Sequence, residues 1–286
     1  SAASDVYKRQ DIAVSQLLVC VPPFVYLKIS GTKTGELIPY KKIRISDALL
    51  AVVMTYLFYP LMLVMNLLTM FFVDNTSAEL AATMGQENLF LNILFVALLP
   101  AFVEEFVFRG VFYQTYRKSS MKAALVLSGL LFGCMHMNFN QMAYAVVLGI
   151  MLGLLAEVTG SILPTMLAHF CFNEISVCIG YFLYHDSSLK KVAESASENI
   201  VMTKQLIITI VSMTPFAVGG LCVAFALLYA LAVINCRKDE VLGMFRRQMR
   251  FADDGSEIRR PRIISIPLVL SLAVCIGFMV ISEILW

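Results

Sequence analysis

Long apolar segments alternate with short polar segments along this chain, and the spacing is typical of membrane helices. A helix that crosses the hydrocarbon core of a bilayer needs about 20 apolar residues. On this basis we predict helices over residues 11–28, 47–73, 88–114, 121–138, 140–157, 161–184, 204–235 and 263–285. The alternation of apolar and polar residues that is typical of barrel strands is absent. The pattern therefore predicts an all-α fold, a polytopic transmembrane bundle of about eight helices.

The polar interruptions divide the predicted bundle into three groups of helices. Residues 11–87 hold the first two helices, residues 88–185 the next four, and residues 186–286 the last two. We predict that the middle group is the functional core, because it holds most of the polar side chains that lie deep in predicted helices. Residues 1–10 are polar, lack an initiator methionine and differ from the apolar segment after them, so we set them aside as a truncation junction or an added sequence.

The composition supports a membrane protein. The chain is 59% hydrophobic and 15% charged, whereas a soluble domain of this size carries about 25% charged residues. We therefore expect the lipid bilayer as a partner, and a net charge of +2 is too small to indicate nucleic acid. The seven cysteines show no CxxC spacing, so we expect neither disulfides nor a cysteine zinc site. Pro22 and Pro23 interrupt the first apolar segment, which predicts an incomplete first helix.

Basic residues gather in alternate loops. The loops after the first and third predicted helices hold Lys28, Lys33, Lys41, Lys42, Arg44, Arg117, Lys118 and Lys122. The loop 236–262 holds eight basic and five acidic residues, and we predict that its segment 241–251 is an amphipathic helix on the lipid surface. Because Lys and Arg concentrate in cytoplasmic loops, we place these loops in the cytoplasm. The compact bundle favours a multi-pass protein of a prokaryotic plasma membrane.

Polar side chains that could carry chemistry lie deep in three of the predicted helices: Glu104, Glu105, Arg109, His136, His169 and Asn173. Glu105 and Arg109 are four residues apart, which favours an ion pair that supports the fold. At 1.5 Å per residue, the positions of Glu104, the two histidines and the asparagine fall about 12–21 Å from the cytoplasmic end. Because polar groups are costly in a membrane unless they meet one another, we expect these four around one cavity that faces the cytoplasm.

These four side chains suit the hydrolysis of a peptide bond. Glu104 beside the imidazole of His136 can take a proton from water. His169 and Asn173 can donate hydrogen bonds to the anion that forms when water attacks an amide carbonyl. Competing intramembrane chemistries lack their motifs: there is no HExxH, no Gly-x-Ser-Gly and no pair of deep aspartates.

We predict no cofactor, although zinc is an open alternative. Glu104, His136 and His169 are residue types that bind zinc, but their spacing is unlike that of an HExxH site.

Three motifs resemble those of a known family. "EEFVFR" fits EExxxR, "FGCMH" fits FxxxH and "HFCFN" fits HxxxN. In this order and on separate helices, they resemble the type II CAAX prenyl endopeptidase-like proteins, also called the CPBP or Abi intramembrane protease superfamily. The resemblance covers about residues 88–180.

The resemblance implies a glutamate-dependent intramembrane endopeptidase, a type historically described as a metalloendopeptidase. Glu104 with His136 would activate water, His169 and Asn173 would form the oxyanion site, and Glu105 with Arg109 would support the fold. The substrate would be a membrane-associated peptide or a lipidated protein, as in CAAX prenyl proteolysis.

Two other functions stay open on the sequence alone. A non-catalytic bacteriocin-immunity or scaffold protein could keep the same fold. A proton-coupled transporter could also use deep Glu, His and Asn side chains, although the outer halves of the predicted helices hold few ionisable residues. We make no prediction of the oligomeric state.

Overall fold

The structure is a computed structural model that describes residues 2–76, 88–186, 202–244 and 263–285. Within these residues the chain is helical and has no strand, as the hydropathy pattern predicts. The elements are α1 (Ala2–Ser30), α2 (Thr34–Leu37), α3 (Ile45–Thr69), α5 (Leu89–Asn92), η1 (Ile93–Leu98), α6 (Leu99–Glu105), η2 (Phe106–Phe112), α7 (Tyr113–Arg117), α8 (Met121–Met135), α9 (Phe139–Thr159), α10 (Leu163–His185), α12 (Met202–Ile234), α13 (Lys238–Gly243) and α14 (Ile266–Leu285).

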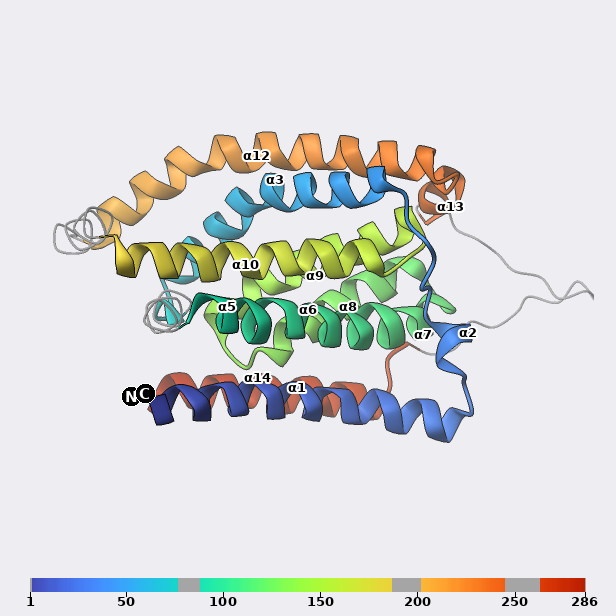
Figure 1. The fold of residues 1–286 in the computed structure, drawn as a ribbon, viewed down its shortest axis with the longest axis horizontal. Helices are drawn as coiled ribbons and strands as arrows, with labels where there is room; N and C mark the ends of the chain where they lie inside the picture. Colours follow the sequence, from blue (N-terminus) through green and yellow to red (C-terminus); the bar gives the residue numbers. More distant parts are fainter. Residues whose placement is uncertain (1, 77–87, 187–201, 245–262, 286) are drawn as a thin grey trace, which may run out of the picture.

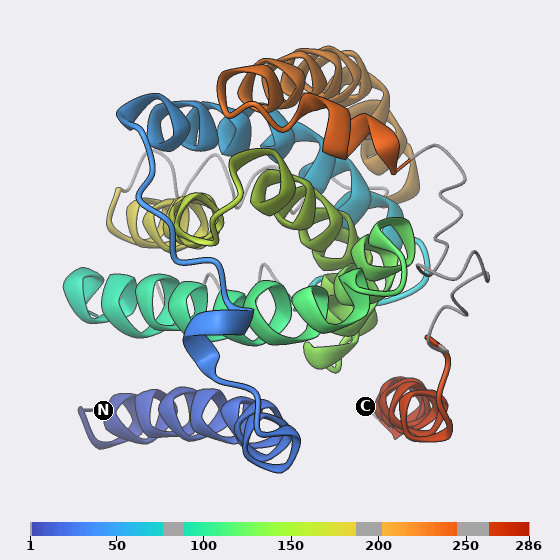
Figure 2. The same ribbon diagram turned by 90° about the vertical axis from the view of Figure 1, so that its right-hand side faces the viewer.

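The long helices lie side by side along the long axis of the molecule (Figure 1). α9 is the most buried of the candidate spans. The end-on view places it among α3, α8, α10 and α12, with the continuous helix α5–α7 on another side (Figure 2). α1 packs against α5–α7, whereas α14 lies at the margin of the bundle beside α8.

Seven of the described helices are long and apolar enough to cross a membrane. The chain is therefore a multi-pass membrane protein, and the eight predicted helices are present, of which α8 is the shortest. This helix has 15 residues, about 22 Å of rise, and so is shorter than the hydrocarbon core. It ends early because Asn138 leaves the helical conformation and caps α9 by accepting a hydrogen bond from the amide of Gln141 at 3.1 Å.

The first helix differs from its prediction. α1 is continuous from Ala2 to Ser30 and includes Pro22 and Pro23. Membrane helices tolerate internal prolines, which here remove two successive backbone donors from a single turn. Part of residues 1–10, which we had set aside, thus belongs to α1. The predicted surface helix 241–251 overlaps the end of α13, and its residues beyond Met244 lie outside the described part of the chain.

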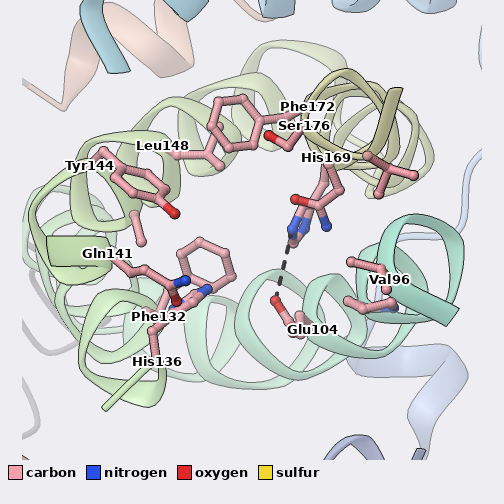
Figure 3. A pocket seen from close by; sticks show the side chains of 14 residues that line it. Val96, Glu104, Phe132, His136, Gln141, Tyr144, Leu148, His169, Phe172 and Ser176 are labelled. Carbon is pink, nitrogen blue, oxygen red and sulfur yellow. Dashed lines mark hydrogen bonds and ion pairs between the residues drawn. The ribbon is translucent and has the colours of Figure 1, made fainter. Parts of the chain in front are cut away.

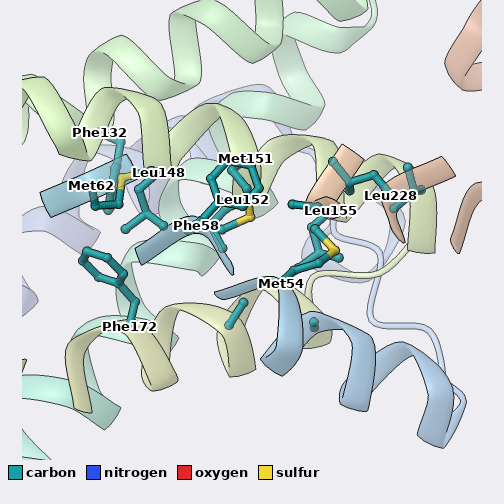
Figure 4. Close-up of a cluster of buried hydrophobic side chains, with 14 of the residues drawn as sticks. Met54, Phe58, Met62, Phe132, Leu148, Met151, Leu152, Leu155, Phe172 and Leu228 are labelled. Atoms are coloured by element: carbon teal, nitrogen blue, oxygen red, sulfur yellow. The ribbon is translucent and has the colours of Figure 1, made fainter. Parts of the chain in front are cut away.

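The main hydrophobic core fills the space between α3 and α9. Met54, Phe58 and Met62 of α3 face Leu148 and other residues of α9 (Figure 4). A second close contact joins α9 to α8, because a Cβ atom added to Gly149 would lie 2.8 Å from the Cα of Gly129. The two backbones therefore approach closely at this level, next to the candidate site.

The loops after α1, α7 and α12 lie at the same end of the bundle, which we call the basic end (Figure 1). A buried carboxylate joins the helices there. Glu157 of α9 is 2% exposed, accepts a hydrogen bond from the Tyr113 hydroxyl at 2.7 Å, and contacts the guanidinium groups of Arg117 and Arg237 at 3.1 and 3.2 Å. We did not predict this cluster from the sequence.

The change Glu157→Ala should destabilise the bundle by about 3 kcal/mol, because it removes the buried acceptor of the Tyr113 hydroxyl and leaves Arg117 and Arg237 with only the more exposed carboxylate of Glu240. The measurement is the thermal unfolding midpoint of the purified protein in detergent. Glu36→Ala is the matched control, since the Lys33–Glu36 pair is 81% and 69% exposed and exposed pairs contribute little. Equal shifts of the midpoint in the two variants would contradict the prediction.

Candidate active site

Glu104 and Glu105 are the last two residues of α6, which lies between the π-helical turns η1 and η2. The two residues are 5% and 0% exposed. π-Helical turns are rare and occur often at functional sites. The helix is thus locally irregular on both sides of the two carboxylates.

The two carboxylates converge on one imidazole. The His169 Nδ1 lies 3.0 Å from Glu105 Oε1, and its Nε2 lies 3.8 Å from Glu104 Oε2 (Figure 3). Because a carboxylate oxygen is an acceptor, this geometry places a proton on Nδ1 and turns Nε2 toward Glu104. We had expected Glu104 to meet His136, but the structure brings it to His169.

The predicted ion pair of Glu105 and Arg109 is present. Arg109 Nη1 lies 2.6 Å from Glu105 Oε1, and both side chains are fully buried. Arg109 also donates to the Gly149 carbonyl at 3.0 Å and lies over the ring of Phe132. Glu105 therefore pairs with Arg109 and also holds His169, because its Oε1 contacts both side chains.

His136 follows the last residue of α8, where its ring is held from one side. Its Nδ1 lies 2.9 Å from the Phe132 carbonyl. A carbonyl oxygen is also an acceptor, so Nδ1 carries the proton and Nε2 keeps a lone pair. The Phe132 ring contacts His136 and His169 edge-on, at centroid distances of 5.2 and 5.4 Å. The two histidines thus lie against the same aromatic ring.

A cavity of about 200 Å³ joins these groups. Glu104, His136, His169 and Asn173 all lie on its wall, together with Gln141, Tyr144, Ser176 and apolar residues (Figure 3). The four residues that we predicted to share a polar layer therefore share one cavity.

The cavity extends away from the basic end. Beyond Glu104 its lining continues to Pro100 and Val96, and beyond His169 it continues to Ser176 and Val177. Both in α5–α7 and in α10, this direction leads to the end of the bundle opposite the basic loops (Figure 1). We had expected the cavity and the basic loops to face the cytoplasm together. The cavity and the basic loops lie on opposite sides of Glu104 and His169, so which of them faces the cytoplasm stays a prediction.

Thiol labelling from each side of the membrane separates the two expectations. In a background without the seven native cysteines, we expect Ser176→Cys and Lys118→Cys to react with a membrane-impermeant reagent from opposite faces. Ser176 is exposed on the cavity side and Lys118 is exposed at the basic end. If Lys118→Cys marks the cytoplasm, as the charge rule predicts, then Ser176→Cys should react only from outside. Labelling of both from one face would contradict this orientation.

One contact of Glu104 was not predicted from the sequence. The side-chain amide of Gln16, on α1, donates a hydrogen bond to Glu104 Oε1 at 2.9 Å. Gln16 is 8% exposed. A glutamine inside the apolar segment of the first helix was the available signal.

The residue set that could hold zinc does not assemble. Within residues 2–76, 88–186, 202–244 and 263–285, no three His, Cys, Asp or Glu side chains are placed to bind one ion. Glu104, His136 and His169 share the cavity wall without forming such a group. We therefore derive no step through a metal.

Comparisons with known proteins agree with the motifs. Residues 86–175 match the family model described as type II CAAX prenyl endopeptidase Rce1-like, which confirms the resemblance. The uncharacterized protein YpbD of Bacillus subtilis (strain 168) is 34% identical over 91 residues, which are 30% of this chain and 44% of YpbD. The match thus spans less than half the length of that relative. No solved structure matches the chain.

Proposed function

We propose that this chain, which carries a segment of the type II CAAX prenyl endopeptidase kind, is an intramembrane endopeptidase in which Glu104 activates the water that attacks a peptide bond. One observation carries the proposal: a buried glutamate lies on the wall of a cavity within the bundle, with its Oε2 3.8 Å from His169 Nε2. A deep carboxylate that faces a cavity suggests a function rather than packing.

In the proposed reaction, Glu104 Oε2 takes a proton from a water molecule in the cavity, and the resulting hydroxide attacks the carbonyl carbon of the substrate. Asn173 donates a hydrogen bond to the oxyanion that forms. The C–N bond then breaks, and Glu104 returns its proton to the leaving amine. His136 Nε2 accepts a hydrogen bond from the other O–H of the water, which holds the water in place.

His169 has a role that depends on Glu105. Glu105 holds Nδ1–H, so the ring keeps its Nε2 beside Glu104. In a neutral imidazole this nitrogen is an acceptor, and it donates to an oxyanion only after it takes up a proton. We therefore assign His169 to the oxyanion, to which it would donate once Nε2 carries a proton. Glu105 and Arg109 support this arrangement.

The proposed substrate is a membrane-associated peptide or a lipidated protein that presents an extended segment to the cavity. The end opposite the basic loops would admit it. Under the charge rule this is the outer face of a plasma membrane, which favours peptides that are exported or that enter from outside.

The test is cleavage of a peptide library by the purified protein in liposomes, read by mass spectrometry. The library contains free and C-terminally prenylated peptides, each with and without a chelator. We expect cleavage at defined bonds that persists with the chelator and falls sharply in His136→Ala. Loss of activity with the chelator, restored by zinc, would overturn the metal-free reaction.

An absence of cleavage by the wild-type protein would overturn the proposed function. In that case a cellular phenotype that survives Glu104→Ala would favour a non-catalytic immunity or scaffold protein.

A further inference from the structure

The side chain that contacts Glu104 from outside the cavity comes from α1. Gln16 lies 88 positions before Glu104 in the chain, yet its amide Nε2 is 2.9 Å from Glu104 Oε1. Gln16 does not line the cavity and precedes the segment 86–175 that matches the family model. It is 8% exposed, so its amide is withdrawn from solvent and lipid.

Apolar contacts in the second half of α1 hold it against the helix α5–α7, which carries Glu104. Phe24 packs on Phe106, with ring centroids 5.5 Å apart. Leu27 lies in a buried cluster with Val111 of η2 and Met166 of α10. These apolar contacts fix the second half of α1 beside η2 and α10. The position of Gln16, about three turns earlier, is a consequence of these contacts.

The two carboxylate oxygens of Glu104 have different partners. Oε1 accepts from Gln16, whereas Oε2 faces His169 and the cavity. The terminal torsion of a glutamate has broad, shallow minima, so an unheld carboxylate turns readily. A hydrogen bond to a charged group is stronger than one between neutral groups, and here it fixes that torsion.

The amide itself can take only one orientation. Nε2 is the donor and faces the carboxylate, and the Gln16 Oε1 has no hydrogen-bond partner among the described residues. A flipped amide would direct its oxygen at Oε1 of Glu104, where two acceptors repel each other. The buried amide is therefore held by the carboxylate and not by other groups of α1.

We propose that Gln16 is a positioning residue that holds Glu104 Oε1 and so keeps Oε2 directed at the water in the cavity. The inference rests on the proposed function, because it assigns Gln16 a part in that same reaction. It also makes α1, which lies outside the matched segment, a component of the site.

The test compares Gln16→Met with wild type and with Gln10→Met in the cleavage assay. Methionine keeps the length of glutamine and removes the donor, and Gln10 is an exposed glutamine on the same helix. We expect Gln16→Met to lower kcat tenfold or more with KM unchanged within twofold, and Gln10→Met to lower neither. In a Glu104→Gln background, Gln16→Met should cause no further loss, because the group that it positions is already inactive.

A purely structural Gln16 predicts another pattern. In that case Gln16→Met would have a lower unfolding midpoint than Gln10→Met and would give less active protein. Its cleavage kinetics per folded molecule would stay at the wild-type level. Unchanged kcat in folded Gln16→Met would overturn the inference.

If that variant does not fold, Gln16→Asn is the second test. It keeps the amide but places it one methylene short of Glu104, so it should lower kcat. Unchanged kcat in Gln16→Asn would also overturn the inference. An inactive wild type overturns both proposals, whereas an active wild type with an unaffected Gln16 variant overturns only this one.

Discussion

Glu104→Gln should lower kcat for peptide cleavage by about 10²–10⁴-fold, the usual contribution of a general base. Glutamine keeps the volume of the side chain but cannot take a proton from water. KM should change little, because we assign Glu104 Oε2, which faces His169 in the cavity, to the water and not to the peptide. The measurement is steady-state cleavage of the best peptide from the library.

Glu174→Gln is the matched control for this variant. Glu174 is a second glutamate within a candidate span and follows Asn173 directly, but it contacts Cys178 on its own helix and does not line the cavity. Its variant should keep kcat near the wild-type value. Equal activities of the Glu104 and Glu174 variants would remove the base from the proposed reaction.

Arg109→Met should be the most destabilising single change at the site, by about 3–5 kcal/mol. It leaves the fully buried Glu105 carboxylate without its cation and removes the hydrogen bond to the Gly149 carbonyl. The expected observations are a large fall in the thermal unfolding midpoint in detergent and a low yield of folded protein. Arg117→Met is a control of the same chemistry in which the arginine side chain is 28% exposed, and it should cost less.

The double variant Glu105→Leu, Arg109→Met separates stability from activity. Replacing both members of a buried ion pair with apolar groups is often close to neutral for stability, so the unfolding midpoint should recover relative to Arg109→Met. Cleavage should not recover, because His169 loses the carboxylate that holds its Nδ1. Recovery of both properties would show that Glu105 only balances Arg109.

The helices and the members of the cavity could be predicted because they depend on local patterns. Apolar segment length locates the helices, and the equal depth of Glu104, His136 and His169 follows from helical rise alone. The spacing of four residues predicts the Glu105–Arg109 pair, which the structure contains at 2.6 Å.

The features that were missed depend on the direction of each side chain around its helix axis and on contacts between helices far apart in the chain. Depth along a helix does not say which way a side chain points, so the approach of His169 to Glu104 was not predicted. Gln16 and Glu157 meet partners 88 and 40 or more positions away, and no local pattern predicts such pairs. The direction of the cavity also depends on how the helices are packed, whereas loop charge reports only the side of each loop.

The two π-helical turns on either side of Glu104 and Glu105 have a consequence for how this chain tolerates insertions and deletions. A π-helical turn holds about one residue more than an α-helical turn, so a chain that lost one residue from η1 could close that turn as regular α-helix. Each residue of an α-helix turns the next by about 100°. Such a deletion would remove the residue that the wide turn accommodates, so the residues before the turn would keep their direction relative to the two carboxylates. A deletion in a regular α-helical part of the same helix would instead rotate the preceding residues by about 100° and redirect their side chains between cavity, lipid and neighbouring helix. Homologous chains are best compared here by the direction in which each residue faces.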